Sequence, residues 1–164
     1  MYRLLLILMI LPSMAFSKGC FDILEKELCY NQYFESVEEI ELFLKRGEDK
    51  YYSGEIEDLN SDNLSEVLLV GNGCNKNCDM VLITRENKGY RVIGRFGGEY
   101  RGPAKIPEAV ALDEETSTKN ESYKNIVVHN NSGWAEGHMN YYMYDGERYH
   151  IIVSSHYNYS GFPL

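Results

Sequence analysis

The sequence predicts an α+β fold in which one or two N-terminal helices pack on an antiparallel β-sheet or meander, stapled by disulfides. Three observations predict this class. Helical periodicity is confined to a helical front at residues 20–47. In a β-rich body at residues 50–164, short apolar runs alternate with Gly, Asn and Asp turns. Four cysteines accompany a leader that is typical of export.

Residues 1–17 are typical of a secretory signal peptide. Arg3 gives a short positive start, an apolar run covers residues 4–11, and Ala15 and Ser17 are the small residues before a cleavage site. The apolar run is shorter than the roughly 20 residues that cross a bilayer. We therefore expect cleavage near Ser17 and a mature single domain, residues 18–164, in the periplasm or outside the cell, without membrane insertion.

Composition limits the partners. The formal charge of the 164-residue chain is −9, and loss of Arg3 with the leader makes it −10. Nucleic acids and anionic membranes are bound through clustered Lys and Arg, so this acidity argues against both. It is compatible with a basic protein partner, and it leaves the oligomeric state open.

The four cysteines predict disulfides. In an oxidising compartment they pair, and the pairs Cys20–Cys29 and Cys74–Cys78 each close a short local loop. A zinc site built from these thiols is the alternative, and lipidation of Cys20 is a second one, which the residues before Gly19 fit poorly.

A capping box begins the clearest helix. In Ser36-Val37-Glu38-Glu39 the Ser hydroxyl and the Glu carboxylate satisfy free amides of the first turn. Apolar residues then recur at helical spacing up to Leu44, and Gly47 is a left-handed stop. Residues 21–33 are also predicted to be helical, with Ile23, Leu24 and Leu28 facing inward.

The body is predicted to be stranded. A turn at residues 87–89 connects two of the strands, Asp145-Gly146 makes a two-residue hairpin turn, and residues 97–120 form a long loop. The predicted strands are Val67–Val70, Met80–Thr84, Tyr90–Phe96, Ile126–Val128, Tyr141–Tyr144 and Arg148–Val153.

An acidic loop carries the most specific chemistry. Its residues are Asp58-Leu59-Asn60-Ser61-Asp62-Asn63-Leu64-Ser65-Glu66. Oxygen side chains stand at alternate positions, as a hard cation with six to eight oxygen ligands requires. The loop is no EF-hand, because Leu69 stands at position 12 where that motif has a glutamate. An Asx-rich turn without an ion is the alternative.

This loop and the strand after it resemble the calcium loop of FG-GAP (integrin-α-like, VCBS-type) repeats. The chain is also similar to small exported bacterial proteins that carry one such loop, a Cys-containing turn and a late aromatic-Asp-Gly hairpin, over residues 55–153. The resemblance implies Ca²⁺, with these ligands: Asp58, Asn60, Asp62, the Leu64 carbonyl and Glu66. Ser61 and Asn63 replace the usual loop glycines, and a single copy cannot build a propeller.

Two further residue sets, the histidines and the aromatic residues of the C-terminal region, bear on metal and partner binding. If the Asp145-Gly146 turn has two residues, His138 lies on the opposite face from His150, so a shared metal site on that hairpin is not expected. Aromatic side chains crowd the same region and predict a partner-binding surface, although ordinary β-propensity also explains them. These residues are Trp134, Tyr141, Tyr142, Tyr144 and Tyr149.

Together these features predict a non-enzymatic binding protein that occupies another exported protein. A periplasmic immunity protein, or an inhibitor of a basic toxin or a cell-wall hydrolase, fits this description. No His-Glu-x-x-His or Gly-x-Ser-x-Gly motif is present, and no catalytic residue is predicted. The alternatives are a calcium-stabilised structural or adhesive envelope module and, third, a hydrolase built on residues 97–120.

Overall fold

The protein is mostly β-sheet, so the predicted α+β class is wrong. The computed structural model describes residues 20–23, 26–45, 50–72, 77–105, 123–131 and 136–158. The predicted leader lies outside these residues. Within them, one short helix accompanies the strands. In chain order the elements are β1 (Cys20–Ile23), β2 (Lys26–Cys29), β3 (Tyr33–Phe34), α1 (Val37–Leu44), β4 (Tyr51–Glu55), β5 (Val67–Gly71), β6 (Cys78–Glu86), β7 (Gly89–Pro103), β8 (Ile126–Asn131), β9 (Glu136–Tyr144) and β10 (Tyr149–Asn158).

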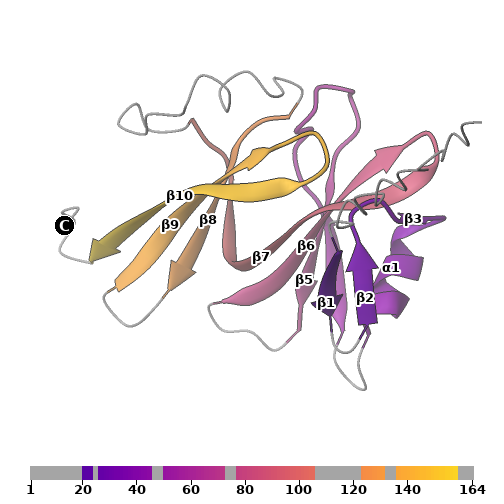
Figure 1. Ribbon diagram of the computed structural model, residues 1–164, viewed down its shortest axis with the longest axis horizontal. Helices are drawn as coiled ribbons and strands as arrows, with labels where there is room; N and C mark the ends of the chain where they lie inside the picture. The colour runs from indigo at the N-terminus through magenta and orange to yellow at the C-terminus, as the bar shows by residue number, and fades with distance from the viewer. Residues whose placement is uncertain are drawn as a thin grey trace, which may run out of the picture.

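The main sheet is antiparallel and sandwich-like. Its strand order is β10-β9-β8-β7-β6-β5-β4, and β3 pairs with the start of β7. The long strand β7 pairs with β6 through residues 89–98 and with β8 through residues 99–103. It therefore carries the sheet from one half, β4–β7, into the other, β7–β10 (Figure 1). Side chains of both halves, such as Met80 and Ile126, pack in one cluster.

Two apolar clusters cover opposite faces of β5 and β6. Leu69 and Val81 pack with α1 and the first hairpin, whereas Leu68 and Met80 face the second half of the sheet. Because both faces are covered, the run Val67–Val70 is apolar without alternation. This confirms the prediction of a buried strand there.

The helix α1 begins where the capping box predicts. Ser36 Oγ accepts a hydrogen bond from Glu39 N (3.2 Å), and Glu39 Oε2 accepts one from Glu35 N (2.7 Å). Ile40 and Leu44 are fully buried against the sheet. The predicted stop at Gly47 lies outside the described residues.

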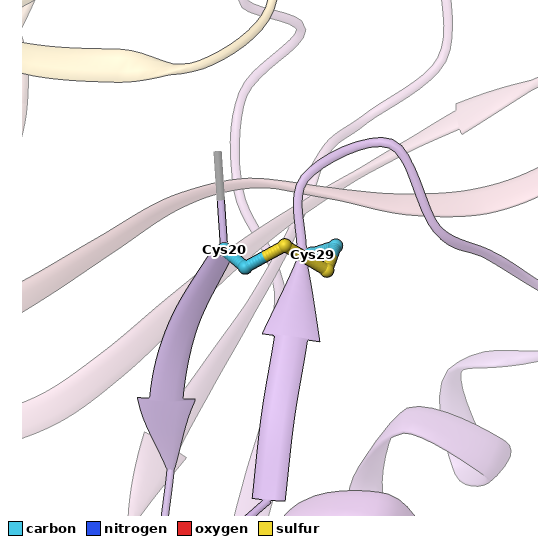
Figure 2. The surroundings of a disulfide bond; sticks show 2 residues. All are labelled: Cys20 and Cys29. Carbon is cyan, nitrogen blue, oxygen red and sulfur yellow. A yellow bond between two sulfur atoms is a disulfide. The ribbon is translucent and has the colours of Figure 1, made fainter. Parts of the chain in front are cut away.

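The second predicted helix, residues 21–33, is wrong. Its place is taken by the hairpin β1–β2, in which Cys20 faces Cys29 and the two form a disulfide (Figure 2). The cross-strand disulfide requires neighbouring strands, because nine residues of helix would separate these Cα atoms by about 13 Å. The observed separation is 3.9 Å.

The predicted loop at residues 97–120 is partly strand. Gly97–Pro103 continue β7, and residues 106–122 lie outside the described part. Gly98 has φ of +140°, and a Cβ there would lie 2.5 Å from the carbonyl oxygen of His129 on β8. Glycine at 98 therefore permits the close approach of β8 to β7 where the sheet passes between its halves.

The C-terminal hairpin forms, but in a different register from the predicted one. Tyr144 faces Tyr149, so the turn has four residues rather than two. Asp145 Oδ1 accepts hydrogen bonds from Glu147 N (2.8 Å) and Arg148 N (2.9 Å), which stabilises the wider turn. A bulge between Ile151 and Val153 shifts the register again.

Candidate binding groove

The acidic loop is organised around the carboxylate of Asp58. Its Oδ1 accepts from the backbone amides of Asn60 (3.1 Å), Ser61 (2.6 Å) and Asp62 (3.3 Å), and its Oδ2 accepts from Asn63 N (2.8 Å). Burial acts to raise the pKa of Asp58, but the four amide bonds together outweigh it and hold the pKa below the ordinary value. Asp58 is thus the internal anchor of the loop.

Two residues of this loop adopt left-handed backbone conformations. Ser61 has φ of 62° and Asn63 has φ of 68°. These are the positions at which glycine is usual in the resembling repeats. The chain therefore makes the sharp turns of such a loop without glycine, the residue that adopts left-handed conformations with the least steric strain.

Glu66 ends the loop and is buried in the sheet. Its Oε2 accepts from Leu59 N (2.6 Å) and its Oε1 from Thr84 Oγ1 (3.2 Å). Burial is the main cause that raises the pKa of Glu66, and the nearby Asp62 and Asp58 add to it. The carboxylate thus ties the loop to β6.

The predicted calcium ligands do not share one ion position in this arrangement. Two oxygens that bind the same calcium ion lie at most about 5 Å apart. The carboxylates of Asp58, Asp62 and Glu66 do not form a group with atoms all within 4.8 Å of one another. A calcium ion would have to draw these side chains together, and calcium binding stays a prediction.

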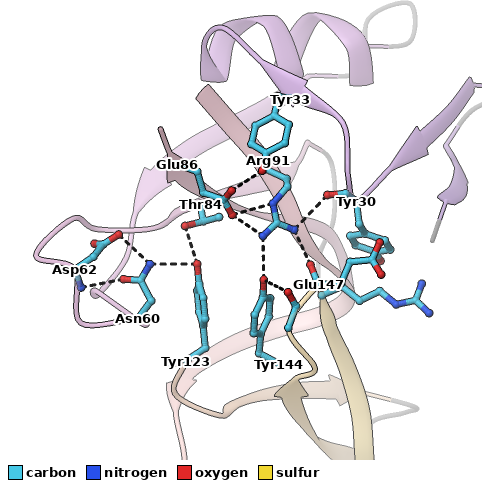
Figure 3. A network of polar contacts seen from close by, with 12 residues as sticks. Tyr30, Tyr33, Asn60, Asp62, Thr84, Glu86, Arg91, Tyr123, Tyr144 and Glu147 are labelled. Atoms are coloured by element: carbon cyan, nitrogen blue, oxygen red, sulfur yellow. Dashed lines mark hydrogen bonds and ion pairs between the residues drawn. The ribbon is translucent and has the colours of Figure 1, made fainter. Parts of the chain in front are cut away.

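A buried arginine network lies beside the loop (Figure 3). Arg91 Nε and Nη2 both donate to Glu86 Oε1 (2.9 and 2.6 Å), and Nη2 also donates to Tyr144 Oη (2.9 Å). Nη1 donates to the carbonyls of Tyr30 (3.3 Å) and Glu147 (2.7 Å). One side chain therefore joins the turn after β2, the β6–β7 hairpin and the β9–β10 turn.

Opposing effects act on the two charges of this network. Burial acts to lower the pKa of Arg91, but the bonds to Glu86 and Tyr144 outweigh it and leave the pKa above the ordinary value. Burial acts to raise the pKa of Glu86, and the bonds from Tyr33 and Arg91 bring it below the ordinary value. Tyr33 Oη donates to Glu86 Oε2 at 2.5 Å. Both groups are held in their charged forms.

A second polar chain connects the network to the acidic loop. Asn60 Nδ2 donates to Asp62 Oδ2 (2.9 Å) and to Tyr123 Oη (3.1 Å), which is 3.1 Å from Thr84 Oγ1. Tyr123 also stacks on Tyr144, with 4.2 Å between ring centroids. The loop, β6 and the segment before β8 are therefore held together at one end of the sheet.

An open polar groove lies over these contacts. Its volume is about 1040 Å³. A smaller hollow of about 460 Å³ adjoins it across Tyr33 and Glu86 and reaches Arg91 and Glu147. The residues that line the larger groove, called the polar groove below, are Tyr33, Asn60, Asp62, Leu64, Arg85, Glu86, Asn87 and Lys88.

The tyrosines of the predicted partner-binding surface do not share an exposed face. Tyr144 and Tyr149 are buried, and Tyr142 packs on the same cluster. Tyr141 is half-buried, and Trp134 lies outside the described residues. The crowding of aromatic residues at this hairpin therefore largely reflects core packing.

Of the two predicted disulfides, the structure describes both cysteines of one pair and a single cysteine of the other. The pair Cys20–Cys29 is confirmed. Glu27 lies near both sulfurs, but thiols in a disulfide are not thiolate ligands, so this group is no zinc site. Cys78 is also disulfide-bonded, and its predicted partner Cys74 lies outside the described residues.

Sequence reasoning found the loop but missed the network. Arg91 and Glu86 flank a predicted hairpin turn, which is a signal that they lie close together. The burial of Arg91 had no local signal, because its carbonyl acceptors come from Tyr30 and Glu147, which are remote in the chain.

Comparison with protein-family models, curated proteins and solved structures finds no match to this chain. The resemblance to FG-GAP repeats thus stays a prediction. In the described part of the chain, no helix has both the length and the apolar character needed to cross a membrane.

Proposed function

We propose that the protein is an exported, non-enzymatic binding protein that occupies another exported protein through the polar groove. An immunity protein or an inhibitor, directed against a secreted toxin or a cell-wall hydrolase, is the role that fits best. The leader typical of a signal peptide supports export, and the disulfide Cys20–Cys29 suits an oxidising compartment.

The shape and lining of the groove carry this proposal. Sites for small molecules are concave, mostly apolar and largely enclosed. The polar groove is open, and Asp62, Arg85, Glu86 and Lys88 place charges of both signs along it. Leu64, which is 44% exposed, adds an apolar contact at its wall. Such a surface suits protruding side chains of a protein partner.

The groove is also built to hold its shape. The bonds of Arg91 fix the turn residues around it, and Asp58 fixes the loop that carries Asp62 and Leu64. A binding surface that is ordered before association loses less conformational entropy on binding. The polar network therefore supports tight binding, because it holds groove residues such as Tyr33 and Glu86 in place before the partner arrives.

Charge supports a basic partner. Without residues 1–17 the formal charge is −10, because the −9 of the whole chain loses the positive charge of Arg3. A net charge of this size attracts a positively charged protein and speeds its association, most strongly at low salt. The cations Arg85 and Lys88 on the groove wall then restrict which partner surfaces fit.

The alternative is a calcium-stabilised structural or adhesive module. The left-handed turns at Ser61 and Asn63 favour it, since such turns direct alternate oxygens of a loop inward. Calcium would then tighten the loop beside the groove, and stability rather than partner binding would depend on the ion.

Affinity capture with matched variants tests the proposal. Residues 18–164, the Leu64→Asp variant and the Leu42→Asp variant would each be immobilised and exposed to exported proteins of the producing cell, with calcium and with chelator. Both leucines are exposed, but only Leu64 lines the groove. We expect one exported protein to bind the parent and Leu42→Asp, but not Leu64→Asp.

Retention by all three proteins, or by none, would contradict the proposed role of the groove. If the partner still binds in the presence of chelator, partner binding does not require calcium. Calcium-dependent stability without any retained partner would favour the structural module.

A further inference from the structure

The observed register of the C-terminal hairpin brings together two histidines that the predicted register separates. His138 on β9 faces His156 on β10, and their ring centroids are 4.9 Å apart. The four-residue turn and the bulge after Ile151 together produce this pairing. The site is remote in sequence from the acidic loop and shares no residue with the polar groove.

We infer that His138 and His156, with Glu136, form a surface site for a divalent ion of the zinc or copper type. Imidazole nitrogen and carboxylate oxygen are suitable donors for such ions. This inference is independent of the proposed protein-binding function.

The spacing of the rings fits one shared ion. A zinc–nitrogen bond is about 2.0 Å, which puts each ring centroid about 3.2 Å from the metal. Two imidazoles at angles between about 90° and 110° then have centroids roughly 4.5–5.2 Å apart. The observed 4.9 Å lies within this interval. Small rotations of the two rings, without movement of the strands, would direct one nitrogen of each toward the ion.

Neighbouring polar groups complete the donor set. Glu136 lies two residues before His138 on the same face of β9, and its Oε2 is 3.9 Å from His156 Nε2. Its side chain is 63% exposed, so it can rotate toward an ion held by the two rings. Without that rotation the three ligand atoms do not share one ion position. Ser154 Oγ is 3.4 Å from His138 Nδ1 and orients that ring, which leaves Nε2 for the metal.

The strands under the site are fixed from the opposite face. Tyr157 lies across Gly137, where an added Cβ would clash with its ring, and its Oη donates to Asn131 Oδ1 (3.4 Å) on β8. The Tyr157 ring also contacts His129 at 4.9 Å. These contacts hold β10 to β8 across β9 and so keep the two metal-binding positions in place.

Zinc titration of the untagged residues 18–164 by isothermal calorimetry tests this inference, because a polyhistidine tag would bind the same ion. We expect one site that weakens at least ten-fold in His138→Ala and in His156→Ala, and several-fold in Glu136→Gln. His150→Ala is the matched control, since His150 is on the same hairpin but faces Met143. Its zinc affinity should equal the parent's.

A second measurement, of the imidazole resonances by NMR, uses the parent protein alone and so does not require the variants to fold. Zinc added to the parent should shift the imidazole resonances of His138 and His156 together at one equivalent, with no comparable shift of His150. Copper(II) should bind more tightly than zinc, and magnesium should not compete. Absence of zinc binding, or unchanged affinity in both His138→Ala and His156→Ala, would overturn the inference.

Discussion

Arg91 connects three chain reversals through a single side chain. Its side chain is 9% exposed, and its guanidinium donates hydrogen bonds to Glu86, Tyr144 and two backbone carbonyls. Removing one partner of a buried ion pair is costly, since the other charge stays buried without compensation. We predict that Arg91→Ala lowers the free energy of unfolding by about 3–5 kcal/mol, as measured by urea denaturation.

The same strand provides the control for this prediction. Arg101 pairs with Glu99 at the surface, where its side chain is 49% exposed. Arg101→Ala should change the free energy of unfolding by less than about 1 kcal/mol, because exposed pairs are screened by water. If Arg91→Ala and Arg101→Ala lower the free energy of unfolding equally, the buried network contributes no more to stability than an exposed ion pair does.

Asp58 makes the stability of the acidic loop depend on pH. Its folded pKa lies below the ordinary value, because four amides bond the ionised form. The stabilisation is therefore present above the unfolded pKa of about 3.9 and is lost as pH falls through the folded pKa. We predict that Asp58→Asn lowers the melting temperature at pH 7 and that the difference from the parent shrinks below about pH 4. A constant difference from pH 7 to pH 2 would contradict this.

At the scale of elements, the acidic loop contains a correctable strain. A non-glycine residue in the left-handed region costs about 1–2 kcal/mol of folding free energy. Substitution by glycine removes this cost, but glycine also gives the unfolded chain more conformational freedom, which offsets part of the stabilisation. We predict that Ser61→Gly raises the free energy of unfolding by about 0.5–1 kcal/mol in urea denaturation.

Ser65→Gly serves as the control, because Ser65 has no left-handed backbone conformation. It should lower stability, since glycine there only adds freedom to the unfolded chain. If Ser61→Gly lowers the free energy of unfolding as much as Ser65→Gly does, the left-handed conformation of Ser61 is not a source of strain.

Elements with local signals were predictable, and those decided by distant contacts were not. Helix α1 carries its own capping box, and the strand Val67–Val70 is bounded by turn residues. The sequence of the hairpin β1–β2 predicts a helix, because Leu24 and Leu28 are four residues apart and also fit helical spacing. The predicted disulfide Cys20–Cys29 was incompatible with that helix, since it would hold the two cysteines about 13 Å apart. The distance constraint from these cysteines could thus have removed the second helix from the prediction.

The candidate site was predictable to a similar extent. Asp58 and Glu66 stood out by spacing, and the structure places both at the ends of one ordered loop. The register of the last hairpin was missed, because the side chain of Asp145 caps a wider turn than Asp-Gly alone implies. The pairing of His138 with His156 was missed for the same reason.

At the scale of the whole molecule, the two halves of the sheet depend on Gly98. Its positive φ and the nearby His129 carbonyl leave no space for a side chain. We predict that Gly98→Ala lowers the free energy of unfolding by more than about 2 kcal/mol, because it forces β8 away from β7. At Gly97 a Cβ meets no atom within 4 Å, so Gly97→Ala should have little effect. Similar losses in both variants would argue against this role of β7.

Site-specific photocrosslinking in the producing cell tests directly whether the polar groove binds an exported protein. A benzophenone side chain would replace Leu64 in the groove in one variant and Leu42 on α1 in another. We predict a single covalent adduct of defined mass from position 64 and none from position 42. An adduct from position 42 alone, or from neither position under conditions in which the partner is captured, would contradict it.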